Sequence, residues 1–380
     1  MSGQPETDAR WMRSAVAMAE SGLGTTAPNP SVGAVVVRDG AEIARAVTQP
    51  GGRPHAETEA LRLAGEATRG ATLYVTLEPC SHHGKTGPCA EAVIAAGVAR
   101  VVVGIEDPDA RVAGRGLAKL RAAGVEVVLG VEAKACRWVT LGHILRATER
   151  RPMVLIKMAL QDDLAVPTGG GGRPNFVTSP EARLMGHRFR AKSDAILVGA
   201  GTVRADDPEL TVRVPGLEQR SPIRIVMDGT LDALTPATKL ARTAHELPVW
   251  VMTTSDAPHD KRAALEDMGV QVRVVDVVGW NSRPDVNEVV AALAEAGITR
   301  LMVEGGRGMW DAFAECGFID EAIVFVNWKP TPAELSGCSV FDKPVTFERL
   351  TRIQITPDMD LAEQGEISGD KWFRFERSGT

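Results

Sequence analysis

The sequence is poor in cysteine and aromatic residues, and it has no long hydrophobic run. Its 380 residues include five Cys, nine Phe, seven Trp and one Tyr. So few cysteines indicate a reducing compartment with free or metal-bound thiols, and they exclude a disulfide framework. No apolar run approaches the roughly 18 residues of a membrane-spanning helix. The N-terminus also lacks the apolar segment of a signal peptide. We therefore expect a cytoplasmic protein that does not enter a membrane.

A strong charge of one sign is also missing. Residues 1–150 carry a net charge of +1 and residues 151–380 one of −7. Neither half has the basic excess that binds a nucleic-acid backbone, and the scarce aromatics disfavour a platform for stacked bases. We expect a small-molecule substrate and no nucleic acid. The length predicts two domains, and 44% hydrophobic and 24% charged residues are ordinary for a globular chain.

Short strands alternate with short helices in the first half. Hydrophobic spacing and the glycines that interrupt it predict the elements. The predicted helices are 8–22, 56–64, 89–96 and 117–123, and the predicted strands are 32–37, 72–77, 100–105 and 125–129. Asp39-Gly40 predicts a hairpin turn. This alternation indicates an α/β layer with a largely parallel sheet.

A charged run from Thr148 to Arg151, closed by Pro152, marks a break in the chain. It predicts a first domain at 1–148, a linker at 149–152 and a second domain at 153–380. A hydroxyl cap, a proline and an acid at Thr178–Glu181 predict a helix start. The predicted strands of this half are 153–158, 195–198, 223–227, 249–252, 270–275, 300–303 and 322–326.

The strongest chemical signal is His55-Ala56-Glu57, followed by Cys80 and Cys89. One His and two Cys are ligands that Zn²⁺ prefers, and three protein ligands leave one tetrahedral position open for water, as in catalytic zinc sites. Glu57 is too close to His55 in sequence to be an ordinary fourth ligand. It is well placed to carry a proton from water to a leaving nitrogen. This is the logic of the zinc deaminases.

The two cysteines are nine positions apart, and the residues between them leave alternatives open. His82 or His83 could be the fourth ligand of a purely structural zinc. Lys85 is either a solvated loop lysine or a contact for a substrate phosphate. The other cysteines, Cys136, Cys316 and Cys338, have no His or Cys nearby in sequence, and we expect core or surface thiols there.

Two glycine-rich turns follow predicted strands in the second half, at 198–202 and 303–309. The second precedes a predicted helix at 310–315, so its backbone N–H groups could bind an anion. Neither turn has the G-x-G-x-x-G spacing of a Rossmann dinucleotide fold. Ordinary turn chemistry explains each of them taken alone.

Several motifs together carry a resemblance that covers essentially the whole chain. The segments 26–30 (TAPNP), 55–57 (HAE) and 76–86 (TLEPCSHHGKT) resemble the bifunctional deaminase–reductase of riboflavin biosynthesis. So do the two glycine turns together with 205–213 (ADDPELTVR). The resemblance implies a cytidine-deaminase-like zinc domain followed by a dihydrofolate-reductase-like α/β domain. The implied cofactors are Zn²⁺ and NADPH.

The implied activity has two steps on a phosphorylated pyrimidine. The first is hydrolytic deamination of 2,5-diamino-6-ribosylamino-4(3H)-pyrimidinone 5′-phosphate. The second reduces the ribosyl group of the product, 5-amino-6-ribosylaminouracil 5′-phosphate, to a ribityl chain with NADPH. The family also suggests a homodimer through the second domain.

The resemblance also assigns residues. It implies His55, Cys80 and Cys89 as zinc ligands and Glu57 as the proton shuttle. On the NADPH side it implies Ala159, Phe176, Thr202, Asp206, Gly306, Arg307, Gly308 and Met309, and on the substrate side Asn29, Lys85, Arg190, Leu210, Arg213 and Glu304. Simpler interpretations remain for some of them. Asn29 could be a turn residue, Asp206 could cap a turn, and Arg190 or Arg213 could form a surface salt bridge.

The second half departs from the family pattern in two segments. The stretch 159–165 (ALQDDLA) lacks the usual Ser, Gly and basic residue, the loop continues through a glycine run to Arg173, and Phe176 stands where Trp is usual. Near the C-terminus, 327–332 (NWKPTP) replaces the run of Pro, Lys, a hydrophobic residue and Gly that is common in the family. The alternative function is therefore a deaminase whose second domain is catalytically silent. A deaminase acting on RNA or DNA and a non-enzymatic zinc module are further alternatives, which the charge and the open coordination position disfavour.

Overall fold

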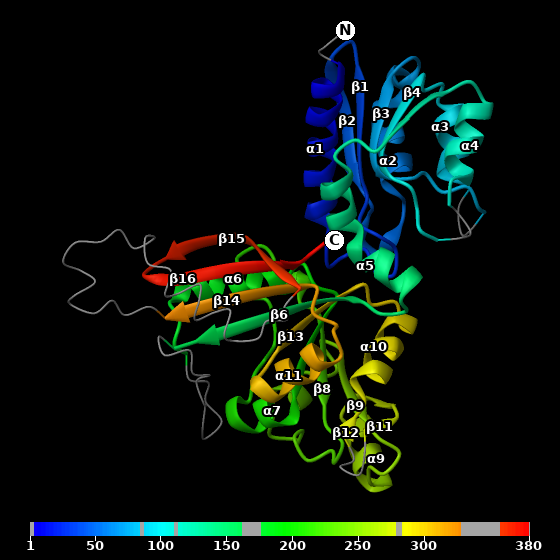
Figure 1. The fold of residues 1–380 in the computed structure, drawn as a ribbon. Coiled ribbons are helices and arrows are strands. Elements are labelled where there is room, and N and C mark those ends of the chain that lie inside the picture. Colours follow the sequence, from blue (N-terminus) through cyan, green and yellow to red (C-terminus); the bar gives the residue numbers. More distant parts are fainter. Residues whose placement is uncertain are drawn as a thin grey trace, which may run out of the picture. The chain divides into compact units, whose positions relative to one another are not determined.

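The fold is described from a computed structural model. The structure describes residues 4–83, 87–109, 113–161, 176–278, 283–327 and 358–379. They form two compact units (Figure 1). Unit 1 comprises the chain up to Pro152 with Leu293–Thr299, and unit 2 comprises Met153–Ala292 with Arg300–Gly379. No helix in the described ranges is both long and apolar enough to cross a bilayer.

Unit 1 is built on a five-stranded sheet with the order β2-β1-β3-β4-β5. The strands are β1 (Gly33–Arg38), β2 (Ala41–Val47), β3 (Thr72–Leu77), β4 (Arg100–Ile105) and β5 (Glu126–Leu129). Strand β1 pairs antiparallel with β2 and β3, whereas β3, β4 and β5 are parallel. The turn between β1 and β2 is Asp39-Gly40. Both residues have positive φ (52° and 77°), as a two-residue hairpin turn requires, so that prediction is confirmed.

Helices cover both faces of this sheet (Figure 1). They are α1 (Gln4–Gly22), α2 (Ala56–Ala64), α3 (Cys89–Ala95), α4 (Arg115–Ala122) and α5 (Ala133–Thr148), with 3₁₀ turns at Pro50–Gly52 and Gly65–Thr68. Alternate residues of a strand face opposite layers. Val35 packs with Met12 of α1 and Cys136 of α5, whereas Val36 packs with residues of α2, α3 and α4. The result is a three-layer α/β/α unit.

A buried carboxylate ties α1 to the sheet. Asp8 accepts hydrogen bonds from Tyr74 Oη (2.8 Å) and from both terminal nitrogens of Arg100 (2.8 and 2.7 Å). Burial by itself would raise the pKa of Asp8, but the hydrogen bonds from Arg100 and Tyr74 outweigh it and lower the pKa below its ordinary value. Asp8 is therefore charged and fully paired at neutral pH.

Unit 2 contains a nine-stranded sheet with the order β10-β9-β8-β7-β13-β6-β14-β16-β15. Its strands are β6 (Met153–Leu160), β7 (Ala195–Gly199), β8 (Ile223–Met227), β9 (Val249–Thr253), β10 (Gln271–Val274), β13 (Arg300–Glu304), β14 (Glu321–Asn327), β15 (Met359–Ile367) and β16 (Asp370–Arg377). The seven strands from β10 to β14 in this order are parallel. The hairpin β15–β16 adds antiparallel to β14. Strands β11 (Val277–Val278) and β12 (Arg283–Pro284) form a separate ribbon.

The helices of unit 2 connect these parallel strands. They are α6 (Pro180–Arg190), α7 (Ala200–Asp206), α8 (Lys239–Arg242), α9 (His259–Asp267), α10 (Val286–Glu295) and α11 (Arg307–Glu315), with a 3₁₀ turn at Glu218–Arg220. The predicted start of α6 is confirmed. Pro180 is its first residue, and Ser179 Oγ accepts a hydrogen bond from the Ala182 N–H group at 3.2 Å.

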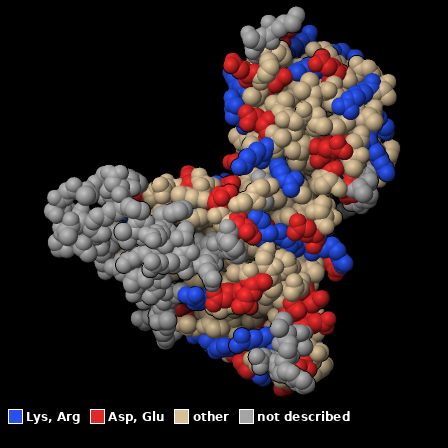
Figure 2. Space-filling view, in the orientation of Figure 1, with Lys and Arg blue, Asp and Glu red and all other residues tan. Residues whose placement is uncertain are grey.

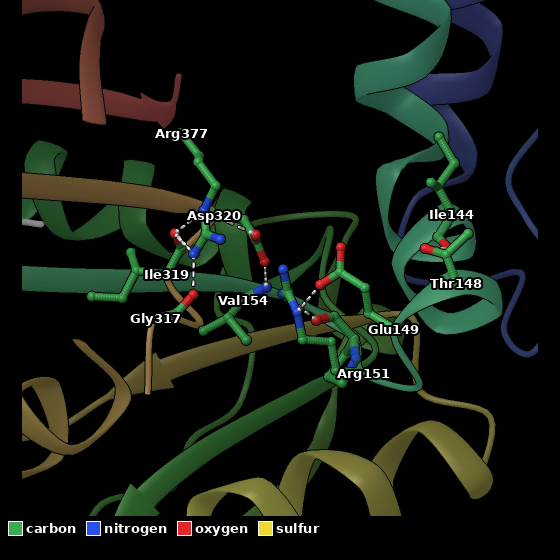
Figure 3. A network of polar contacts seen from close by, with 10 residues as sticks. Ile144, Thr148, Glu149, Arg151, Val154, Gly317, Ile319, Asp320 and Arg377 are labelled. Atoms are coloured by element: carbon green, nitrogen blue, oxygen red, sulfur yellow. Dashed lines mark hydrogen bonds and ion pairs between the residues drawn. The ribbon is translucent and has the colours of Figure 1, made fainter. Parts of the chain in front are cut away.

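One polar network joins the beginning of β14 to β6 and β16 (Figure 3). The Val154 N–H group donates to Asp320 Oδ2 at 2.9 Å, and the Asp320 N–H group donates to the Val154 carbonyl at 3.0 Å. Arg377 donates to the carbonyls of Gly317 and Ile319. These bonds satisfy backbone groups just before β14 and at the start of β6, and they tie the end of β16 to the same place.

The α/β character and most of the predicted strands agree with the structure, and four differences have physical causes. Strand β2 and helix α5 are absent from the prediction, since β2 carries charges and α5 lacks a clear apolar stripe. The hairpin β15–β16 is also absent, because its polar alternation resembles a loop. The glycine turn at 198–202 is corrected. Gly199 precedes α7 and Gly201 lies inside it, although glycine has low helix propensity.

We expect Asp8→Asn to lower the free energy of unfolding of the protein by about 2 kcal/mol, because it weakens the buried acceptor of Tyr74 and removes one of the two carboxylates that pair with Arg100, which keeps Glu126. The test is urea unfolding followed by circular dichroism. The matched control is Asp39→Asn, whose carboxylate is 92% exposed. A depressed folded-state pKa contributes stability above the unfolded value of about 3.9 and loses it as pH falls through the folded pKa. The difference from wild type should therefore shrink below about pH 4. Equal midpoints for both variants at pH 7 would contradict the role of Asp8.

Candidate functional site

In unit 1, three predicted ligands meet where two helices begin. His55 is the residue before α2, Cys89 is the first residue of α3, and Cys80 lies in the loop after β3. The His55 Nδ1 atom lies 3.3 Å from Cys89 Sγ and 3.7 Å from Cys80 Sγ. All three ligand atoms lie within 4.8 Å of one another. The sequence placed these residues 34 positions apart, and the fold gathers them at one point.

These distances fit a zinc ion. Zinc bonds of about 2.3 Å to sulfur and about 2.0–2.1 Å to nitrogen, at a tetrahedral angle, place N and S ligand atoms about 3.6 Å apart. The observed separations bracket that value. Among the described residues, the cluster of potential metal ligands consists of His55, Cys80 and Cys89. His83 lies 3.6 Å from Glu91 instead, so a fourth ligand from His83 finds no support.

The surroundings of Cys80 favour its thiolate form, which attracts a metal cation. Hydrogen bonds from the Cys89 thiol and the Cys89 N–H group, with His55 beside it, lower the pKa of Cys80 to about 4. The sharing of that proton raises the pKa of Cys89. Cys80 is therefore a thiolate at neutral pH, which is the form that binds metal.

Glu57 lies in the first turn of α2 and is 3% exposed. Burial raises the pKa of its carboxyl group to about 7, although the nearby His55 opposes this change. The carboxyl group contacts the Cys89 side chain. His55 and Cys89 are both candidate ligands. The carboxyl group of Glu57 therefore lies beside the predicted metal position, and it is not itself one of the three candidate ligands.

Asn29 supports the segment that leads to His55. Its Nδ2 atom donates to the Gly52 carbonyl at 2.7 Å. Gly52 has φ of 85°, and a Cβ there would lie 2.7 Å from Asn29 Nδ2. The close approach therefore requires glycine. Asn29 is thus more than an isolated turn residue, and the structure leaves its contact with substrate as a prediction. Lys85 lies outside the described residues.

Unit 2 contains a cavity of about 1040 Å³. Every described residue that the sequence assigned to cofactor or substrate in this half lines it. These residues are Ala159, Phe176, Arg190, Thr202, Asp206, Leu210, Arg213, Glu304, Gly306, Arg307, Gly308 and Met309. The cavity opens where β7 and β13 end and the helices α7 and α11 begin. Ligands of parallel α/β sheets bind at this edge.

The beginning of α11 confirms the predicted order of strand, glycines and helix. Strand β13 ends at Glu304, Gly306 is the residue before the helix, and α11 begins at Arg307, three residues earlier than predicted. The residues of this first turn line the cavity, and the free N–H groups of a helix start suit a phosphate. A Cβ at Gly199 would lie 3.0 Å from Met309 Cε, so this glycine lets α7 and α11 pack closely.

Three charged side chains lie together, half-buried, in the cavity wall. Arg190 donates from Nε to Glu304 Oε1 (2.6 Å) and from Nη2 to Glu304 Oε2 (2.9 Å). Burial would raise the pKa of Glu304, but Arg190 and Lys157 lower it to about 2. Burial lowers the pKa of Lys157, and Glu304 opposes that change. Arg190 therefore does form a salt bridge, as the simpler interpretation expected, and this pair is half-buried in the cavity wall.

His187 joins this wall between two arginines. Burial, with Arg190 and Arg213 nearby, lowers its pKa to about 4, so the imidazole is neutral at pH 7. Its Nδ1 atom accepts a hydrogen bond from the Arg213 N–H group at 3.3 Å. Arg213 itself forms an exposed ion pair with Glu209 (3.0 Å), as the simpler interpretation expected, while it also lines the cavity.

Sequence reasoning missed two functional candidates, Lys157 and His187. Lys157 had a usable signal, because it is the one charge in the apolar strand 153–160 (MVLIKMAL). His187 had none, because its neighbours Arg190 and Arg213 become visible only in the fold. The unusual loop at 162–175 and the segment 328–332 lie outside the described residues, as does Cys338. Cys136 is buried and Cys316 is half-buried, as expected for thiols without a metal partner.

Two family models match the chain. Residues 5–105 match the cytidine and deoxycytidylate deaminase zinc-binding region, and residues 163–329 match the RibD C-terminal domain. Among similar proteins, the riboflavin biosynthesis protein RibD of Escherichia coli is 38% identical over 96% of this chain and 97% of its own length. The RibD of Aquifex aeolicus is 39% identical over 84% of this chain and 87% of its own.

Solved structures agree over the full length. Acinetobacter baumannii RibD has a TM-score of 0.80 at 30% identity and covers 99% of this chain and 100% of its own. A Thermotoga maritima protein has a TM-score of 0.79 at 30% identity, covering 98% and 99%. It is named a diaminohydroxyphosphoribosylaminopyrimidine deaminase and 5-amino-6-(5-phosphoribosylamino)uracil reductase.

We expect Cys80→Ser to abolish stoichiometric zinc binding, because a serine hydroxyl stays protonated and is a poor ligand at pH 7. The measurement is metal content per chain by mass spectrometry after dialysis. Cys316→Ser is the matched control, since Cys316 lies outside the cluster. Full zinc occupancy in the Cys80 variant would show that the ligand set is wrong.

Proposed function

Because the chain belongs to the RibD family of riboflavin-biosynthesis proteins, in which a deaminase domain precedes a reductase domain, we propose a division of labour between its two sites. Unit 1 deaminates a phosphorylated diaminopyrimidine, and unit 2 reduces the ribosyl group of the product with NADPH. The enzyme acts on a small pyrimidine substrate. The observation that carries this proposal is the convergence of His55, Cys80, Cys89 and Glu57 in one unit and of the predicted NADPH residues on one cavity in the other.

In the deamination, water adds to the carbon that bears the 2-amino group and ammonia leaves. Zn²⁺ held by His55, Cys80 and Cys89 supplies the Lewis acidity that makes water nucleophilic near pH 7. Glu57 takes the proton from water and passes it to the departing nitrogen, so one buried carboxyl group serves both proton transfers. Asn29, anchored to Gly52 beside this site, is the proposed contact for the pyrimidine, and Lys85 the proposed contact for the phosphate.

In the reduction, the bond between C1′ and the ring oxygen of the ribosyl group breaks. C1′ gains a hydride and the oxygen gains a proton. Ala159, Phe176, Thr202, Asp206 and 306–309 would hold NADPH, which would supply the hydride. We assign the proton to Lys157, a half-buried lysine that lines the cavity and whose charged form the nearby Glu304 favours.

The substrate side of the cavity then contains Arg190, Leu210, Arg213 and Glu304. Glu304 already neutralises Arg190, so Arg213 is the freer cation for a phosphate, and its exchange of Glu209 for phosphate costs little at an exposed pair. Neutral His187 between them adds a hydrogen-bonding group without repelling either arginine.

The alternatives are less well supported. A silent second unit does not explain three half-buried charges arranged around an open cavity, since removing charges from water is costly. On the face shown in Figure 2, basic and acidic side chains are interspersed on each unit, and no basic stripe is seen among the described residues of that face. This disfavours a nucleic-acid substrate. The low cysteine content leads us to expect a cytoplasmic location. The family leads us to expect a homodimer through unit 2, which light scattering can test.

We expect Glu57→Gln to bind zinc normally and to lose deamination by about 10²–10⁴-fold, because an amide cannot shuttle a proton. The assay follows ammonia release from the diaminopyrimidinone ribosylamino phosphate. Glu59→Gln, two residues on in the same helix and paired with Arg62, is the control and should remain active. Normal turnover in the Glu57 variant would refute the proposed mechanism.

We expect Lys157→Gln to reduce NADPH oxidation roughly 100-fold or more, with ammonia release unchanged. The variant should fold, because Glu304 keeps its bonds to Arg190. Lys261→Gln is the control, since Lys261 is an exposed lysine paired with Asp232. NADPH absorbance is followed after complete deamination. If the wild-type enzyme releases ammonia but consumes no NADPH, the silent-domain alternative is correct.

A further inference from the structure

Glu78 is a buried carboxylate that the proposed chemistry does not use. It lies between the end of β3 and the Pro79-Cys80 pair, and it is 3% exposed. Its Oε2 atom accepts hydrogen bonds from the N–H groups of Asp107 (3.2 Å) and Gly114 (2.9 Å). Its Oε1 atom accepts from those of Gly116 (2.8 Å) and Leu117 (3.2 Å). Four backbone donors thus converge on one side chain.

Three of these donors belong to the beginning of α4. Gly114, with φ of 74°, is the residue before the helix, and Gly116 and Leu117 lie in its first turn. The first N–H groups of a helix have no partner within it and carry its positive dipole end. Gly114 has no side chain with which to cap them. The carboxylate of Glu78 therefore caps α4 from a segment 36 residues away in sequence.

The beginning of α4 also packs directly on the residue before the zinc ligand. A Cβ placed on Gly116 would lie 2.0 Å from the Pro79 carbonyl oxygen, so the two backbones touch. On the other side of the segment, the Ala90 N–H group donates to the Cys80 carbonyl at 3.1 Å, and the Cys89 N–H group donates to Cys80 Sγ at 3.3 Å. Cys80 is thus held between the starts of α3 and α4.

We propose that Glu78 is a positioning residue for the zinc site, which fixes the Cys80 thiolate by anchoring its segment to the beginning of α4. The inference deepens the proposed zinc site and rests on it. The physical reason is that Cys80 lies in a loop, where a thiolate would otherwise sample several positions, and ordering it in advance removes that entropy from metal binding. Residues that orient a ligand in this way contribute about 10–100-fold to metal affinity.

The test compares Glu78→Gln, Glu78→Asp and wild type in the full-length chain, with Glu66→Gln as a surface control. Zinc affinity is measured by competition with a chromophoric chelator, and the thermal midpoint and NADPH oxidation report on folding. In Glu78→Gln, an amide NH₂ faces two of the four donors, so we expect the zinc Kd to rise about 10–100-fold with reduction unchanged. Glu78→Asp keeps both oxygens with a shorter reach and should recover part of the affinity.

Gly116→Ala tests the same coupling with Glu78 intact. Its methyl group would displace the start of α4 from Pro79, and we expect a similar loss of zinc affinity. If wild type and Glu66→Gln bind one zinc and both Glu78→Gln and Gly116→Ala bind it as tightly, the positioning role is refuted and the zinc site stands. If wild type itself binds no zinc, the proposed zinc site fails. If Glu78→Gln does not fold, Gly116→Ala decides, and unchanged affinity in that variant refutes the proposal.

Discussion

The chemistry of unit 1 depends on the approach of His55 Nδ1 to two sulfur atoms, at 3.3 and 3.7 Å. That approach exists because α2 and α3 both begin on one face of the sheet, each directly at a ligand. Helix N-termini favour negative groups, and Glu57 and Cys89 both lie in these first turns. One arrangement of helix starts therefore gathers the ligands and places the proton carrier beside them.

The requirement on unit 2 is different, because its proposed reaction needs a cavity that holds two molecules side by side. A cavity of about 1040 Å³ lies at the upper end of the range for small-molecule sites, which suits a nucleotide and a second phosphorylated ligand. The start of α11 lines this cavity and offers backbone N–H groups there. The charges are the half-buried Arg190–Glu304 pair and the nearby Lys157, where partial exclusion of water strengthens any interaction with substrate.

Residues adjacent in sequence were the easiest to predict. His55 and Glu57 were found from their local spacing. Apolar runs such as 100–105 predicted strands with the observed bounds. The cavity wall required more, because Lys157, His187 and Arg190 come together only through the parallel pairing of strands and the position of α6. Without the resemblance, Arg190 alone would have been assigned to the surface. Gly199 and Gly201 were misleading, because Gly199 lies just before α7, where it approaches Met309, and Gly201 lies inside that helix despite its low helix propensity.

Glu78 shows why the most informative residues of a motif are not always those that touch substrate. In the sequence, Glu78 is a single acidic residue between a predicted strand and a zinc ligand, and no basic residue nearby could pair with its charge. Its four partners lie 29 to 39 positions away and are all backbone N–H groups, which no side-chain pattern reveals. A carboxylate is required there because it alone offers two oxygens that accept only, matching four donors. Glu78 therefore links the segment of the zinc ligand Cys80 to the beginning of α4, and a displacement of either one would shift the other.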